Sequence, residues 1–324
     1  MPTGTMKKLT IFITIDTEDG YFDVPRLITG EGLAGSPGVY KILDLTEKYG
    51  FRSNVFLDVY SHNEFQPGVL QQIALAIHER GHAVELHTHP DMRLDFYRNN
   101  IYCYPLEEQV RILEYGKRLI YEWTGENPVA HRGGSYALNE DTLASLHRVG
   151  IPIDSTLFLH HKNNKIPGRL TVNKVTSYSR TIEVPITYVK VVKKDGDLLD
   201  TKFDLDALSA DELIQVIQLA KEHNLHTLTL FLHSFSFIHK KTKNTTEEDD
   251  PKAIFRASSR GGSVKCEIYG VDLNDMLKYD RLLNYIAQDL EIEVLTFREW
   301  YDNSKASATA RGRGSDAIPV LDRR

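Results

Sequence analysis

The segment KLTIFITIDTEDG, residues 8–20, sets the architecture of this chain. Its apolar part spans about seven residues and is rich in β-branched side chains, a pattern typical of a β-strand. The apolar part then runs into Asp16, Glu18 and Asp19, and no small-residue cleavage site follows. These features predict a first strand rather than a signal peptide.

The same strand pattern recurs along the chain and alternates with helical patterns. We predict strands at residues 8–16, 52–59, 82–89, 127–132, 151–157, 225–233 and 291–297. One intervening helix is predicted to begin near Ser36 and end at Gly50, and another to begin at Asn139 as its N-cap and end at Gly150. Because strands and helices alternate, we predict a parallel sheet covered by helices, and seven such units indicate an incomplete or distorted α/β barrel.

Three regions depart from this alternation. Residues 166–194 resemble short hairpins and predict a β excursion from the barrel. Residues 239–266 are polar and charged and predict a long mobile loop, and residues 303–324 predict a disordered tail. We therefore predict one domain over residues 1–302.

The composition excludes several classes of protein. The chain has 324 residues, of which 41% are apolar and 26% charged, as in ordinary soluble proteins. A net charge of −6 argues against nucleic acid as the main partner, and no apolar run approaches the ~20 residues that cross a bilayer. Only two cysteines occur, Cys103 and Cys266, so a disulfide framework is not expected and a cytoplasmic location fits. The sequence carries no signal of its oligomeric state.

Polar residues gather where the predicted strands end. In a parallel barrel the carboxyl ends of the strands meet at one rim, where functional side chains collect. Five of the seven predicted strands deliver titratable groups to this rim, which stability alone does not explain. These groups lie in the segments Asp16–Gly20, His87–Asp91, His131–Gly134, Asp154–Ser155 and His233–Ser234.

The spacing within two of these segments is suited to a metal site. Side chains two apart in a strand point the same way, so Asp16 and Glu18 can face one space and His87 and His89 can face it together with them. Two imidazoles and a carboxylate can hold Zn²⁺ or a similar divalent ion and leave a position open for water. On a helix the same function would need a spacing of four.

Several of these segments, in this order, resemble the motifs of the NodB-like polysaccharide deacetylases, a carbohydrate esterase family. The resemblance covers roughly residues 8–300. It is carried by TIDTEDG, GHAVELHTHP, HRGGSYALNEDTLASLHRVGIPIDSTL and LFLHSFSF. The family's fold is a distorted (β/α)7 barrel, which agrees with the strand count above.

The resemblance implies a role for each matched residue. Asp16 would be the catalytic base, held by Arg132 through a bidentate contact, and His233 the general acid. A divalent metal would be bound by Glu18, His87 and His89. The expected ion is Zn²⁺, with Co²⁺, Ni²⁺ and Mn²⁺ as alternatives.

The chain also departs from the family's pattern. The first motif usually has adjacent aspartates, whereas Thr17 separates the acidic residues here. The second motif usually spaces its histidines four apart, and four residues after His87 stands Asp91. Asp91 and Asp19 therefore remain alternative ligands, and Gly133-Gly134 replace the usual prolines after the arginine. Five aromatic residues near the rim either stack on a sugar ring or close the core: Tyr21, Phe22, Tyr136, Phe235 and Phe237.

These observations predict a metal-dependent hydrolase that removes an acetyl group from an N-acetylated sugar or polysaccharide intermediate, in polysaccharide biosynthesis. Two alternatives remain open. The same barrel could hydrolyse a non-sugar carbon–nitrogen bond, as in an amide or cyclic ureide. The chain could instead be a non-catalytic carbohydrate-binding protein that retains a degenerate site.

Overall fold

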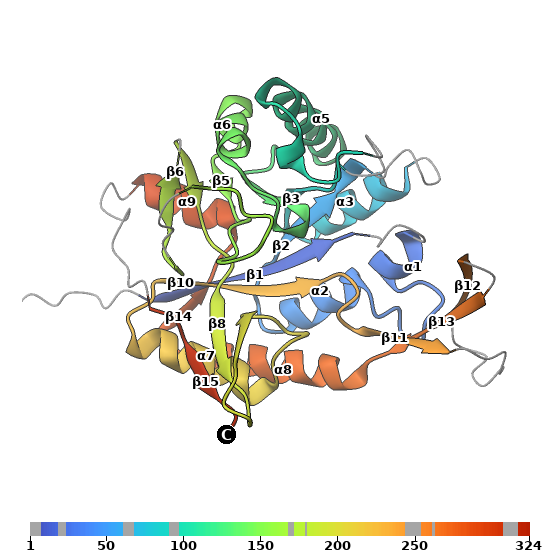
Figure 1. The fold of residues 1–324 in the computed structure, drawn as a ribbon, viewed down its shortest axis with the longest axis vertical. Coiled ribbons are helices and arrows are strands. Elements are labelled where there is room, and N and C mark those ends of the chain that lie inside the picture. The colour runs from blue at the N-terminus through green and yellow to red at the C-terminus, as the bar shows by residue number, and fades with distance from the viewer. Residues whose placement is uncertain are drawn as a thin grey trace, which may run out of the picture.

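A curled, mostly parallel β-sheet forms the centre of the protein (Figure 1). The computed structural model describes residues 8–18, 24–60, 68–90, 97–167, 172–178, 180–243, 254–260, 263–306 and 317–324. Across these residues the strand order of the sheet is β10, β1, β2, β3, β4, β5, β7 and β6, with β14 also paired to β1. All of its pairings except that of β6 with β7 are parallel.

The predicted strands are confirmed as members of this sheet. They are β1 (Leu9–Thr17), β2 (Asn54–Asp58), β3 (Ala83–Thr88), β4 (Ala130–Gly133), β5 (Ile153–Asp154), β10 (Thr227–His233) and β14 (Ile292–Val294). The region expected to leave the barrel also contributes to the sheet. Its strand β7 (Thr181–Glu183) pairs in parallel with β5, and β6 (Thr176–Tyr178) folds back antiparallel on β7. The reason is burial, since β7 is buried along its whole length and so behaves as a barrel strand.

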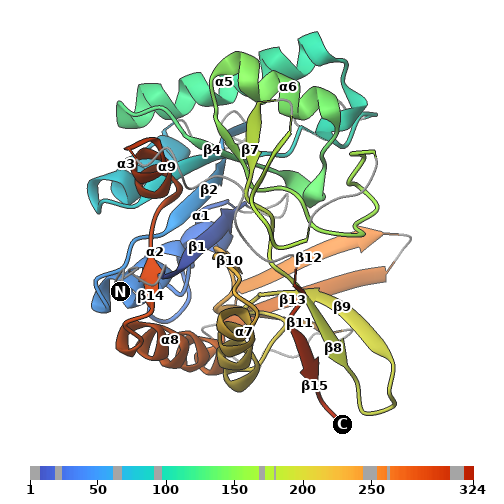
Figure 2. The ribbon, with the colours of Figure 1, turned by 90° about the vertical axis from the view of Figure 1, so that its left-hand side faces the viewer.

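Most of the helices lie around the outside of the curled sheet. Figure 2 shows α5 and α6 at the top and α7 and α8 at the bottom, with the strands between them. The helices are α1 (Val24–Thr29), α2 (Val39–Lys48), α3 (Val69–Glu79), α5 (Leu106–Thr124), α6 (Glu140–Val149), α7 (Ala210–Glu222), α8 (Leu273–Gln288) and α9 (Phe297–Ala306). Helix α6 begins and ends as predicted: the Asn139 side chain accepts a hydrogen bond from the Thr142 amide, and Gly150 follows in the left-handed conformation. No described helix combines the length and apolar character needed to cross a membrane.

Alternate residues of β1 face opposite sides of the sheet. The three isoleucines of β1 belong to the core that the sheet forms with the outer helices, whereas Phe12 packs with Phe56 and Phe297 on the other face. Asp16 lies four residues beyond Phe12 and therefore shares its face. The strand thus carries a carboxylate to its carboxyl end on the enclosed side of the sheet.

The segment 203–205 extends the parallel arrangement beside β10. The amide of Phe231 donates to the carbonyl of Phe203 at 2.9 Å, and the amide of Leu205 donates to the carbonyl of Phe231 at 3.1 Å. Asp204 pairs with Phe231 as an isolated parallel bridge. This segment therefore carries its own polar residues to the rim where β10 ends.

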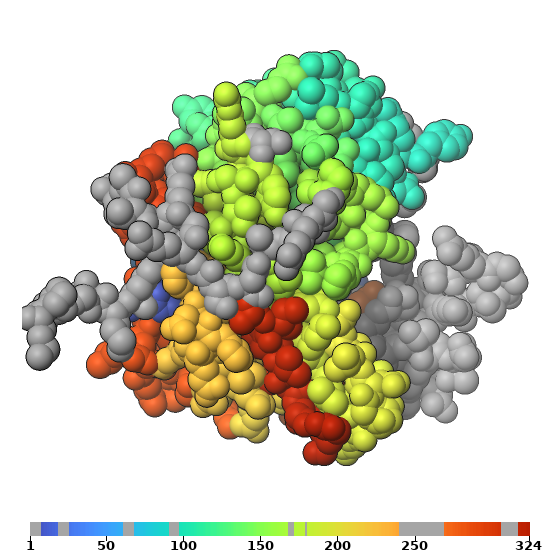
Figure 3. Space-filling view, turned by 60° about the vertical axis from the view of Figure 1, so that its left-hand side comes forward, coloured from blue at the N-terminus to red at the C-terminus, as the bar shows by residue number. Residues whose placement is uncertain are grey.

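Two smaller sheets lie beside the barrel. Strands β11 (Ile238–Lys243), β12 (Ile254–Arg260) and β13 (Ser263–Val271) form an antiparallel sheet that projects from the body (Figure 1). Strands β8 (Tyr188–Val192), β9 (Leu198–Lys202) and β15 (Val320–Asp322) form another, and Figure 3 shows the C-terminal residues, which include β15, in red on the surface.

Both sheets contain segments that the sequence did not predict as strands. The segment 239–266 was expected to be a mobile loop and 303–324 a disordered tail, but β15 and much of β11, β12 and β13 fall within them. Polar strands of this kind are held by backbone pairing to a neighbour, which a local polarity pattern does not reveal. Residues 244–253, 261–262 and 307–316 lie outside the described residues. The division into one domain over 1–302 stays a prediction.

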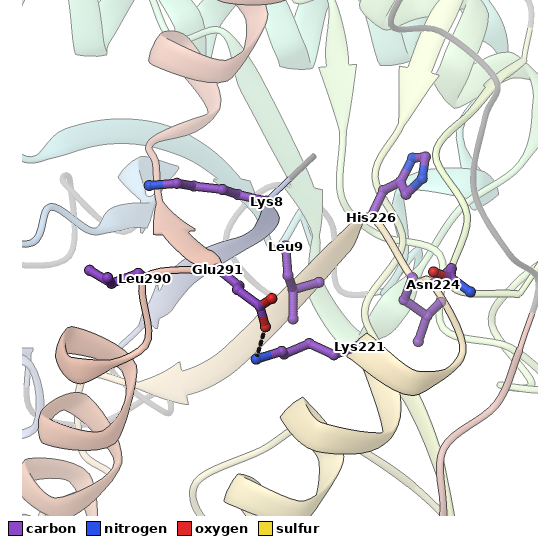
Figure 4. A pocket seen from close by; sticks show the side chains of 8 residues that line it. Lys8, Leu9, Lys221, Asn224, His226, Leu290 and Glu291 are labelled. Atoms are coloured by element: carbon purple, nitrogen blue, oxygen red, sulfur yellow. Dashed lines mark ion pairs between the residues drawn. The ribbon is translucent and has the colours of Figure 1, made fainter. Parts of the chain in front are cut away.

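A pocket of about 390 Å³ lies at the amino ends of the strands (Figure 4). Lys8 and Leu9 line it at the start of β1, and Glu291 lines it just before β14, paired with Lys221 at 2.5 Å. Because it lies at the opposite end of β1 from Asp16, it is separate from the predicted site.

Candidate active site

The carboxyl ends of four barrel strands bring the predicted residues to one rim. Asp16 on β1 lies in register with His233 on β10, and His87 on β3 lies in register with Arg132 on β4. Glu18 and His89 follow directly after β1 and β3. The convergence expected from the sequence is therefore present in the sheet.

Glu18, His87 and His89 form a compact group. Glu18 Oε2 lies 2.6 Å from His89 Nε2 and 3.4 Å from His87 Nε2. One ligand atom from each of the three residues lies within 4.8 Å of the others, and among the described residues this is the one such group that could hold a metal ion. His87 is buried, whereas Glu18 and His89 are partly exposed, so the group opens toward the rim.

The charge state of Glu18 follows from its two neighbours. Burial opposes its ionisation, but the charge of His89 and the hydrogen bonds from His87 and His89 outweigh that effect. The pKa of Glu18 therefore lies well below its usual value. The group thus offers an ionised carboxylate beside two imidazoles.

The donor chemistry of this group fits a divalent metal ion. Two imidazole nitrogens and a carboxylate oxygen are ligands that Zn²⁺ takes in open sites. His87 Nδ1 lies 2.9 Å from the carbonyl oxygen of Arg132, and because a carbonyl only accepts, Nδ1 carries the proton in this contact. Nε2 is then the nitrogen of His87 that faces Glu18, an orientation that outer partners commonly impose on metal-binding histidines.

Arg132 is fully buried and connects the Glu18–His87–His89 group to Asp16. Its Nη1 donates to Asp16 Oδ1 at 2.7 Å and to Thr14 Oγ1 at 3.0 Å. Its Nε and Nη2 donate instead to the carbonyl and the hydroxyl of Ser155, at 2.9 and 3.1 Å. The Arg132–Asp16 contact is therefore made through one nitrogen and is not the bidentate pair that was predicted, because Ser155 takes the other donors.

His233 lies beside Asp16 at the end of β10. Its Nδ1 lies 3.2 Å from Asp206 Oδ2, and its ring stacks on Phe235 with centroids 4.8 Å apart. Burial opposes the charged form of His233, but the hydrogen bond to Asp206 outweighs it and raises the pKa of His233. The imidazole is therefore held in place at one nitrogen and retains its proton to higher pH than an ordinary histidine.

Comparison with known proteins bears on the fold of this chain. No protein-family model matches it, and no curated protein sequence does. Among solved structures, a protein from Mycobacterium smegmatis that is named as a polysaccharide deacetylase matches with a TM-score of 0.56 and 13% identity, over 98% of this chain and 95% of that one. The chain has the polysaccharide deacetylase fold. This fold agrees with the predicted distorted (β/α)7 barrel.

The deacetylase fold is also shared by an enzyme with another named activity. A 4-alpha-glucanotransferase from Thermococcus litoralis matches with a TM-score of 0.53 and 11% identity, over 98% of this chain and 42% of that one. Since proteins with two different named activities share the fold, a function can be inferred only from the side chains at the rim.

The sequence did not single out Asp206 or Lys202, which the deacetylase fold brings to this rim. Lys202 is nearly buried, with Nζ 2.9 Å from Asp204 Oδ2 and 3.2 Å from the centroid of Phe231. Asp206 follows the segment that pairs with β10. The available signal was the alternation of Asp204 and Asp206 shortly before the helix cap Ser209.

An aromatic wall lies next to these charges. Tyr136 has a left-handed backbone with φ of 57°, and its ring lies 4.6 Å from that of His161 and 5.2 Å from that of Phe158. Asn163 Nδ2 donates to the carbonyl of Ser135 at 2.9 Å, which holds this strained turn.

Of the other predicted aromatics, Phe235 contacts His233, whereas Phe237 is buried in the core against Tyr279.

Asp154 and His131 lie behind the site rather than in it. Asp154 Oδ1 is 2.7 Å from His131 Nδ1, and His131 Nε2 is 3.0 Å from the hydroxyl of Thr88. All three side chains are buried, so they form a structural layer under the strand ends. Four further candidates lie outside the described residues, namely Asp19, Tyr21, Phe22 and Asp91.

Proposed function

We propose that this protein is a metal-dependent hydrolase that removes the acetyl group from an N-acetylated sugar or polysaccharide intermediate. The observation that carries the proposal is the meeting of a Glu18–His87–His89 group with Asp16 and His233 at one rim of the sheet. This arrangement would supply a cation site, a carboxylate and an imidazole whose pKa is raised, within one deacetylase fold.

Glu18, His87 and His89 would hold the divalent ion. Their donor set suits Zn²⁺, with Co²⁺, Ni²⁺ and Mn²⁺ as alternatives. When bound, the ion would polarise the acetyl carbonyl and lower the pKa of water beside it. Side chains of the protein would act as the general base and the general acid.

Asp16 acts as the general base in this proposal. The Arg132 guanidinium occupies Oδ1 of Asp16 and leaves Oδ2 outside that contact, which supplies an acceptor for the proton of the attacking water. Because Arg132 is itself fixed by Ser155 and by the rings of Phe56 and Phe231, the carboxylate has little freedom to turn away.

His233 acts as the general acid. The water oxygen bonds to the carbonyl carbon, the carbon–nitrogen bond of the acetamide breaks, and His233 gives its proton to the departing amine. Acetate and a free amino sugar result. The hydrogen bond from His233 to Asp206 supports this role because it fixes the ring and favours its protonated form.

The test is acetate release from N-acetylated chito-oligosaccharide by the purified protein supplied with Zn²⁺ or Co²⁺. Asp16→Asn and His233→Ala are expected to lower kcat by about 100-fold or more, the usual contribution of a general base or acid. His147→Ala, at an exposed position on α6, is the matched control and should keep wild-type activity. Wild-type turnover in both site variants overturns the assigned roles.

Acetate release, compared with oligosaccharide binding and with ring opening of a cyclic ureide, separates the alternatives. A wild-type protein that binds the oligosaccharide but releases no acetate would be a non-catalytic binding protein. Ring opening of a cyclic ureide without acetate release would mean that the barrel hydrolyses a different carbon–nitrogen bond.

A further inference from the structure

Gly134 lies directly against the ring of His89. A Cβ atom added to Gly134 would stand 2.4 Å from both Cε1 and Nε2 of His89, and 2.5 Å from its Cδ2. These distances are far shorter than any van der Waals contact between carbon and a ring atom. The three atoms closest to the added carbon all belong to His89.

The glycine is needed here for space and not for backbone conformation. Gly134 is absent from the glycines of positive φ, so its backbone is open to alanine. The clashing atoms belong to the far end of a side chain, which can move. At Gly133, by contrast, an added Cβ would meet the carbonyl oxygen of Ala137 at 2.3 Å, and backbone would have to shift. A side chain at 134 would therefore displace the His89 ring before it disturbed the fold.

The room for that displacement is limited by the metal group itself. Glu18 Oε2 lies 2.6 Å from His89 Nε2, and the rings of His87 and His89 have centroids 4.9 Å apart. His87 is fixed by the carbonyl of Arg132. Moving the His89 ring away from Gly134 thus changes its distance to both partners.

We propose that Gly134 is a positioning residue that gives His89 the space to serve as a metal ligand only two residues after His87. The inference rests on the proposed metal site. It assigns three tasks to one short segment: the Arg132 side chain holds Asp16, the Arg132 carbonyl orients His87, and Gly134 admits His89. It also gives a physical reason for a glycine at this point of the chain, where a bulkier residue would exclude the second histidine.

The test compares Zn²⁺ affinity, measured by competition with a chromophoric chelator, for the wild type and Gly134→Ala. We expect Gly134→Ala to lose about 10- to 100-fold in affinity, the usual effect of disturbing the surroundings of a metal ligand. The absorption spectrum of the Co²⁺-loaded protein should change as well, while thermal unfolding in EDTA should stay near that of the wild type.

Gly270→Ala is the matched control. A Cβ at Gly270 would also meet a histidine ring, at 2.5 Å from Cε1 and 2.6 Å from Nε2 of His239, but this histidine lies outside the metal group. Gly270→Ala should therefore keep wild-type Zn²⁺ affinity. An equal loss of affinity in both glycine variants would overturn the inference.

A double variant makes the argument specific to His89. His89→Ala should weaken Zn²⁺ binding, and adding Gly134→Ala should cause no further loss. If Gly134→Ala alone fails to fold, the double variant should fold again because the clashing ring is gone. A further loss in the double variant, or its failure to fold, overturns the inference.

Two remaining outcomes separate the inference from the proposed function. Wild-type Zn²⁺ affinity in Gly134→Ala would overturn the inference and leave the metal site intact. A wild-type protein that binds none of Zn²⁺, Co²⁺, Ni²⁺ and Mn²⁺ would overturn the metal site, and the inference with it.

Discussion

Arg132 shows how one residue can organise several others. Its guanidinium has five N–H donors in a fixed plane, and four hydrogen bonds from them reach Asp16, Thr14 and Ser155. Its faces lie near the rings of Phe56 and Phe231, with the central carbon 4.2 and 5.0 Å from their centroids. A buried charge with this many partners is fixed in position, so it transmits that position to the Asp16 carboxylate.

A substitution of Asp206 tests its effect on the pKa of His233. Asp206→Asn removes the carboxylate whose hydrogen bond raises the pKa of His233, so that pKa should fall. An acid that must be protonated to act then loses its proton at lower pH. We expect the alkaline limb of the profile of log(kcat/KM) against pH to move to lower pH, with the rate at its plateau reduced as well.

Asp211→Asn, at an exposed position in the first turn of α7, serves as the control and should leave the profile unchanged. An alkaline limb that stays in place in Asp206→Asn would mean that His233 is not the group titrating there.

Among elements, β5 and β7 are joined by two carboxyl groups that lie in register. Asp154 on β5 is paired with Glu183 on β7, and both side chains are buried. Glu183 Oε1 accepts from the Leu157 amide at 3.0 Å, while Oε2 finds no N–H or O–H donor among the described residues. Glu183 and Asp154 can form a hydrogen bond with each other only if one of the two carboxyl groups carries a proton. Burial, followed by the charge of Asp154, raises the pKa of Glu183 well above its usual value.

This pair predicts a dependence of stability on pH. Glu183 keeps its proton in the folded protein at pH values where the unfolded chain, with a pKa of about 4.3, has lost it. The stabilisation is therefore full below that pKa and is lost as pH rises through the raised value, by up to about 1.4 kcal/mol per pH unit. Glu183→Gln should remove this loss, because its amide can donate to Asp154 without a titratable proton.

The measurement is the free energy of unfolding in urea from pH 5 to pH 9. Relative to the wild type, Glu183→Gln should gain stability steadily toward high pH. Glu140→Gln, at an exposed position on α6, should follow the wild-type curve. Parallel curves for Glu183→Gln and wild type would show that Glu183 is ionised in the folded protein.

The elements differ in how far the sequence can predict them. Helix α6 was predicted with both ends because its signals are local: Asn139 caps the first turn and Gly150 closes the last. The strand β7 was predicted only as part of a β excursion and not as a member of the barrel sheet, and the segment 203–205 was not predicted, because their partners β5 and β10 lie far away in sequence. A strand of three residues has too few side chains for its period to be recognised.

The same distinction applies to the candidate site. Asp16, His87 and Arg132 lie at the ends of strands with strong apolar patterns, so their meeting at one rim could be predicted from the barrel rule. Asp206 lies on an irregular segment whose neighbour, β10, is known only from the fold. The room that Gly134 leaves for His89 depends on how closely the segments just after β3 and β4 approach each other, which no spacing in the sequence contains.

For the whole molecule, the Glu18–His87–His89 group brings together residues from separate strands of the barrel. Glu18 follows β1, His87 lies at the end of β3 and His89 follows that strand, and β2 lies between these two strands. An ion bound by all three residues would bind the folded chain but find no preformed site in the unfolded chain. Binding to the folded state alone raises its stability, by about 2.7 kcal/mol at a free ion concentration 100 times the Kd.

Removal of the metal should therefore lower the Tm of the protein. We expect Tm in excess EDTA to lie below Tm in excess Zn²⁺, because the ion is lost when Glu18, His87 and His89 separate on unfolding. In Glu18→Gln the carboxylate is replaced by a weaker neutral ligand, so the difference between the two conditions should shrink. Glu79→Gln, on the outer helix α3, should keep the wild-type difference. Equal Tm values for the wild-type protein in EDTA and in Zn²⁺ would mean that no ion links the ends of β1 and β3.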